Sequence, residues 1–177
     1  DLIIKGGILQ SDLDIITNNN GASCTIEGGK FLSNVPNYYI VYNFGSLTIK
    51  DGTFISKKNS IISVQADAKA TISSGKFYGE NHAIAIQSGG IASISGGYFS
   101  SKENCATIYN GYGDKGIVYI SGGYFTNLYK KNNTPSDPWK PILGYQSTSV
   151  NIQKTIEGIQ CIYNYQVVPN LRQGSDG

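Results

Sequence analysis

The chain is poor in several residue types, in long apolar runs and in net charge, and these shortages exclude several classes of protein. Its 177 residues include no methionine, one histidine, one tryptophan and a single arginine, Arg172. No run approaches the roughly 18 apolar residues of a membrane-spanning helix, so no membrane insertion is expected. The net charge of +2 leaves no basic surface for nucleic acid and no acidic tail.

Motifs that carry common chemistry are also missing. Cys24, Cys105 and Cys161 match no zinc-binding spacing, and a disulfide between Cys105 and Cys161 is left open. The chain has no G-x-S-x-G elbow, and its Gly-Gly pairs precede no helix, as a phosphate-binding loop requires. We therefore expect no metal, no cofactor and no catalytic residue, and the chain leans away from being an enzyme.

What the chain does have is a repeat. In six copies at a regular spacing, an isoleucine is followed three residues later by glycine, and in five of these copies a phenylalanine comes two residues after that glycine. The isoleucines are Ile4, Ile26, Ile49, Ile72, Ile94 and Ile120, spaced 22 to 26 residues apart. Such a period indicates one structural unit stacked on itself. The residues before each isoleucine alternate between apolar and mostly Thr or Ser, as in a strand with one buried face.

Two columns of side chains should run along the stack. The phenylalanines should form an aromatic ladder of Phe31, Phe54, Phe77, Phe99 and Phe125. A second strand in each unit ends in an amide, which predicts a hydrogen-bonded ladder of Asn18, Asn43, Gln65, Gln87 and Asn110. The glycine of each motif should bend the chain, either through a positive φ or through close backbone approach.

These features predict an all-β chain that forms a single-stranded parallel β-helix, or β-solenoid, of about six coils over residues 1–126. Helical repeats are excluded because they need apolar residues three and four positions apart. Residues 127–177, in the same domain, should form a loop and β-hairpin cap followed by a tail. The array opens inside a strand and lacks a starting methionine, so we expect another coil or domain ahead of Asp1, or a partner chain that covers this end, as in a homotrimer.

The repeat with its amide column resembles the right-handed parallel β-helix of the pectate-lyase-like superfamily. The segments "SGGYF" and "LTIKDGTF" more narrowly resemble glycine-rich β-helix repeats of Gram-positive surface proteins and of phage tail or appendage proteins. The resemblance implies a right-handed fold, an extracellular, cell-surface or virion location, and a carbohydrate or host-surface ligand. Lyases of this superfamily use clustered Asp residues, but the acids here occupy no matching positions in successive coils.

Candidate binding residues are those that vary between copies. Tyr98 and Tyr124 share one outward column, which suggests an aromatic platform for sugar rings or a protein partner. The other candidates are Tyr78, Lys76 and Trp139, together with Tyr112 and Asp114 of the insertion at 110–116.

Three functions remain in view. The first is a non-catalytic extracellular module of a surface protein or adhesin that projects or binds glycan or protein ligands. The second is a piece of a phage tail fibre, expected to be trimeric, that binds host polysaccharide. The third is a polysaccharide lyase or glycoside hydrolase, which would need carboxylates that converge on one face.

Overall fold

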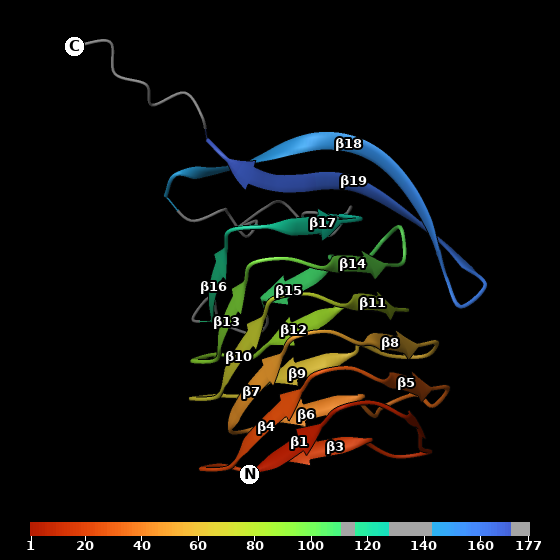
Figure 1. Cartoon of the computed structure of the whole chain (residues 1–177), viewed down its shortest axis with the longest axis vertical. Helices are drawn as coiled ribbons and strands as arrows, with labels where there is room; N and C mark the ends of the chain where they lie inside the picture. Colours follow the sequence, from red (N-terminus) through yellow and green to blue (C-terminus); the bar gives the residue numbers. More distant parts are fainter. Residues whose placement is uncertain (111–115, 128–142, 171–177) are drawn as a thin grey trace.

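A computed structural model describes residues 1–110, 116–127 and 143–170 of the chain. In these ranges every regular element is a β-strand, and the strands form three sheets that wind as a β-solenoid of about five turns (Figure 1). No helix among the described residues is long and apolar enough to cross a membrane. The all-β parallel β-helix expected from the repeat is confirmed.

The first sheet, sheet A, carries the repeated isoleucines. Its six strands are β1 (Leu2–Ile4), β4 (Ser23–Ile26), β7 (Ser46–Ile49), β10 (Lys69–Ile72), β13 (Ile91–Ile94) and β16 (Ile117–Ile120). They pair in parallel, with each repeated isoleucine aligned on the next. The alternation places these isoleucines inside, where Ile26, Ile49 and Ile72 are fully buried.

Sheets B and C complete each coil. Sheet B contains β2 (Ile8–Gln10), β5 (Lys30–Ser33), β8 (Thr53–Ser56), β11 (Lys76–Gly79), β14 (Tyr98–Ser101) and β17 (Gly123–Phe125). Sheet C contains β3 (Ile16–Asn18), β6 (Val41–Asn43), β9 (Ile62–Val64), β12 (Ile84–Ile86) and β15 (Ile108–Asn110). The first coil lies at the open end of the stack, where Leu2, Ile3 and Ile8 remain 47%, 59% and 73% exposed.

The phenylalanine ladder is confirmed. The five rings are buried and stack face to face, with centroids 4.6, 4.8, 4.6 and 5.1 Å apart in order along the array. The glycine two residues before each ring has a positive φ, from +108° at Gly97 to +142° at Gly52. Each motif therefore combines a bend that only glycine adopts readily with a phenylalanine ring that stacks on the ring of the neighbouring coil.

The amide ladder is only partly as expected. Asn18 and Asn43 do align, and Asn18 donates to the Asn43 side-chain oxygen at 2.7 Å. Asn43, however, pairs with Val64, so Gln65 and Gln87 lie one residue beyond the column. The full column is Asn18, Asn43, Val64, Ile86 and Asn110. The reason is that register follows the buried apolar residue two positions earlier, which fixes the inward face of each strand.

The predicted hairpin forms, but it does more than cap the last coil. Strand β18 (Tyr145–Ile156) and strand β19 (Ile159–Pro169) pair antiparallel around a turn at Glu157 and Gly158, both with positive φ. Strand β19 extends sheet B by pairing antiparallel with β17. Figure 1 shows the hairpin curving over the end of the stack, with its turn directed back past the sheet B strands.

Candidate functional site

The outer face of sheet B carries apolar side chains that need cover. Leu32, Ile55 and Tyr78 align in successive coils and point away from the solenoid core. Ile55 is nonetheless only 2% exposed. Since an outward aliphatic side chain on a solenoid has no covering coil of its own, its burial requires another element, and this element is the hairpin.

The hairpin covers this face through alternate residues of β19. Cys161 and Tyr163 are buried and pack with Ile156 against Ile55, while Ile159 joins the edge of the same cluster. Further along β19, Tyr165 and Val167 pack against the interior core at the end of the phenylalanine ladder. One strand thus closes the solenoid and also clamps its outer face.

Tyr98 and Tyr124 lie beneath this clamp. Their rings stack at 4.7 Å, which confirms that they share a column. The edge of Tyr163 packs against Tyr98 at 5.4 Å, and the Lys154 ammonium lies 3.9 Å from the centroid of the Tyr98 ring. The open aromatic platform that the sequence suggested is therefore corrected to a partly buried packing surface, because the hairpin occupies it.

The far end of the hairpin is tied to the second coil. Glu157, in the turn, forms an ion pair of 2.5 Å with Lys30 of β5. The two side chains are 45% and 30% exposed, so water screens the pair and its contribution is modest. The contact fixes where the hairpin ends, four coils away from its attachment at β17.

A cleft of about 460 Å³ opens beside the hairpin, and we refer to it below as the hairpin cleft. One side is formed by the ends of sheet B strands and the following turns, with Ser100, Ser101, Lys102, Glu103, Thr126 and Asn127. The other side is β19, which contributes Gln160, Ile162 and Asn164, and Tyr78 completes the lining. Ile162 is 46% exposed, so the cleft combines an accessible apolar group with hydroxyls and amides.

The walls of the hairpin cleft are held by side-chain hydrogen bonds. Asn127 donates to the backbone carbonyls of Lys102, Glu103 and Cys105 at 3.0 to 3.2 Å. Asn164 of β19 donates to the carbonyl of Thr126 at 2.9 Å, which joins the hairpin to the last coil. These bonds fix the turn that carries Lys102 and Glu103 relative to the hairpin.

Charges near the cleft form a connected group. Lys102 and Glu80 form an ion pair of 2.6 Å, and the Tyr78 hydroxyl donates to Glu80 at 2.9 Å. The hydrogen bond from Lys102 is the largest factor that holds the pKa of Glu80 below its ordinary value. Burial, followed by the bond to Glu80, raises the pKa of Tyr78 to about 12. Tyr78 is therefore a neutral phenol at physiological pH.

The remaining binding residues suggested by the sequence lie in different parts of the molecule. Tyr78 lines the cleft, whereas Lys76 lies exposed at the start of β11. Tyr112, Asp114 and Trp139 lie outside the described residues. Sequence reasoning missed Gln160, Ile162 and Asn164. The apolar outward column at Leu32, Ile55 and Tyr78 was a sequence signal that another segment covers this face.

Two features concern metal and redox chemistry. Cys105 and Cys161 remain thiols, as does Cys24. Within the described ranges, no three His, Cys, Asp or Glu side chains are grouped as they would need to be to hold a metal ion.

Comparison of the chain with protein-family models, with curated proteins and with solved structures finds no significant match.

Proposed function

We propose that this chain is a non-catalytic extracellular β-solenoid module that binds a carbohydrate ligand in the hairpin cleft. The observation that carries the proposal is the composition of that cleft. Amide groups line both sides, with Gln160 of β19 exposed, and the solenoid side adds the hydroxyls of the buried Ser100, Ser101 and Thr126. Ile162 and Tyr78 add apolar surface. A sugar presents hydroxyls at its edges and C–H groups on its faces, so it matches such a lining.

The location of the cleft supports the same proposal. Recognition sites often lie on turns held by a rigid scaffold. Here the turn at Lys102 and Glu103 is fixed by Asn127, and the opposite wall is a long antiparallel strand. A ligand that enters a preformed site loses less affinity to the ordering of side chains and loops.

The charge distribution favours a ligand without a strong net charge. Lys102 is paired with Glu80, and Glu103 lies on the same turn. One cation and two carboxylates leave a single net negative charge at the rim, which disfavours a polyanionic ligand. With this function we also propose that the chain is related to the pectate-lyase-like superfamily. The parallel coils and the amide contact between the first two coils support this relationship.

A glycan array with two matched double variants tests the function. Gln160→Ala/Ile162→Thr removes a polar and an apolar group from the cleft at exposed positions of β19. Gln153→Ala/Ile3→Thr makes the same two chemical changes at exposed positions outside the cleft lining. We expect the first variant to bind about tenfold or more weakly, which corresponds to about 1.4 kcal/mol. We expect the second to bind as the unmodified chain does.

Two results would overturn this function. One is the absence of glycan binding by the unmodified chain, which would leave a spacer role. The other is equal binding by both double variants, which would remove the hairpin cleft as the site. Release of unsaturated or reducing ends from a polysaccharide would instead establish an enzyme.

A further inference from the structure

The outer face of sheet A differs from that of sheet B because no described strand covers it. Its central column aligns a hydroxyl-bearing side chain in each of five consecutive coils: Thr25, Thr48, Thr71, Ser93 and Tyr119. In a parallel sheet such groups recur at about 4.8 Å, the spacing between strands. The face is thus a regular row of hydrogen-bonding groups.

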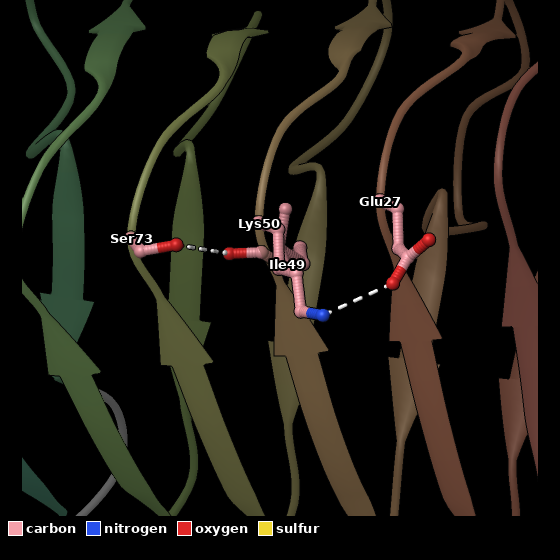
Figure 2. Close-up of polar contacts among 4 residues, drawn as sticks. All are labelled: Glu27, Ile49, Lys50 and Ser73. Carbon is pink, nitrogen blue, oxygen red and sulfur yellow. Dashed lines mark hydrogen bonds and ion pairs between the residues drawn. The ribbon is translucent and has the colours of Figure 1, made fainter.

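A groove of about 280 Å³ lies on this face over the last three coils, and we refer to it as the sheet A groove. Its lining is Thr71, Ser93, Ile94, Ser95, Tyr119 and Ser121, so the described lining holds no charged side chain. The coils before it differ, because the column that continues to Ser73, Ser95 and Ser121 holds an ion pair of 3.0 Å between Lys50 and Glu27. Figure 2 shows Glu27, Lys50 and Ser73 in successive coils, where this column changes from charged to hydroxyl.

The serines of the groove have hydrogen-bonding capacity to spare. Ser73 donates to the carbonyl of Ile49 at 3.3 Å (Figure 2). Ser95 and Ser121 make the same contact to Ile72 and Ile94, but at 3.5 Å. This is long for an O–H···O hydrogen bond, whose usual range ends near 3.0 Å. The two hydroxyls can therefore turn toward a ligand at little cost, and their lone pairs are available as acceptors.

Tyr119 departs from its column in a way that suits a ligand. The three preceding coils have Thr48, Thr71 and Ser93 at this position, and the aromatic ring appears only beside the groove. Its side chain is 49% exposed, unlike the stacked and clamped Tyr98. A ring with one open face next to several hydroxyls offers both stacking and hydrogen bonding.

We propose that the sheet A groove is a second binding site, for an uncharged saccharide whose ring stacks on Tyr119 while its hydroxyls bond to Ser93, Ser95 and Ser121. The site is on a different sheet from the hairpin cleft, and it does not depend on ligand binding there. A module with two such sites can hold one polymer at two points, or two polymers at once, and gains avidity without new contacts.

NMR titration of the uniformly nitrogen-labelled chain tests the proposal, with neutral cello-, manno- and xylo-oligosaccharides as probes and oligogalacturonate as the charged comparison. Tyr119→Thr installs the residue that Thr48 and Thr71 provide in the same column, so the fold should be retained. Tyr38→Thr, at another exposed tyrosine, is the matched control. We expect saturable shifts of the Tyr119, Ser95 and Ser121 amide resonances with a neutral probe. Binding read at the Ser95 and Ser121 amides should be at least tenfold weaker after Tyr119→Thr but not after Tyr38→Thr.

The outcomes separate this site from the hairpin cleft. The Gln160→Ala/Ile162→Thr variant should leave the Tyr119 titration unchanged, whether or not the cleft binds anything. The proposal is overturned if no neutral probe shifts Tyr119, if Tyr119→Thr binds as well as the unmodified chain, or if oligogalacturonate binds the groove as tightly as the neutral probes.

Discussion

Replacement of Gly75 by alanine should destabilise the solenoid by two separable effects. Gly75 has φ +123°, a conformation that residues with a Cβ rarely adopt. A Cβ there would also lie 2.8 and 2.9 Å from two ring carbons of Phe77, and 3.3 Å from the carbonyl oxygen of Gly52. The backbone strain costs about 1–3 kcal/mol. Overpacking against the stacked ring adds about 1–3 kcal/mol.

The opposing effect is smaller. Alanine restricts the unfolded chain more than glycine does, which returns about 0.4–1 kcal/mol. The net loss in the free energy of unfolding should therefore be about 1–6 kcal/mol. Phe77 has little room to move, because Phe54 and Phe99 stack on its two faces at 4.8 and 4.6 Å.

Two glycines of the first coil isolate the contributions. Gly7 has φ +99° and no atom of the described ranges within 4 Å of an added Cβ, whereas Gly6 has the same open space and no positive φ. In urea denaturation followed by circular dichroism, Gly6→Ala should be neutral or slightly stabilising and Gly7→Ala should show the strain alone. Gly75→Ala should exceed Gly7→Ala by about 1–3 kcal/mol. Equal losses for Gly75→Ala and Gly7→Ala would refute the role assigned to the fixed phenylalanine ladder.

Three further outcomes are expected. Tyr163 is fully buried and its hydroxyl has no hydrogen-bond partner among the described residues. Tyr163→Phe should therefore leave the free energy of unfolding unchanged or raise it by about 1 kcal/mol, and a clear loss in urea denaturation would mean that the hydroxyl is satisfied. Glu157→Gln should lower the free energy of unfolding by about 1 kcal/mol or less in low salt and should speed hydrogen exchange at the hairpin turn. In high salt the variant and the unmodified chain should not differ, and an effect that persists there would contradict a screened ion pair. The pKa of Tyr78 rises from 10.0 to about 12 on folding, so the stability it contributes is complete below pH 10 and is lost as pH rises through 12. Tyr78→Phe should remove that part of the alkaline destabilisation, and an unchanged pH profile between these values would contradict it.

The interior of the fold was largely predictable, because its columns obey a local rule. In a parallel stack, each inward residue contacts its equivalent one coil away. The neighbours of Ile72 and Phe77 can therefore be predicted from the same positions in the adjacent copies of the motif. The isoleucine register and the phenylalanine ladder followed from this repetition. The amide column could not be predicted in the same way. Gln65 and Asn43 look equivalent because each follows a strand, but the strand register depends on which neighbouring residue is buried, and it pairs Asn43 with Val64.

The candidate sites were less predictable, because their residues come from segments that no repeat relates. The repeat alone predicts the coil, its bends and its stacked core, since these arise between equivalent positions one period apart. The position of the hairpin along sheet B is seen only in the folded molecule. That packing clamps Tyr98, joins Glu157 to Lys30 and forms the cleft with Ile162. The contacts span up to 127 residues and depend on the curvature and direction of a single hairpin, which no periodic pattern encodes.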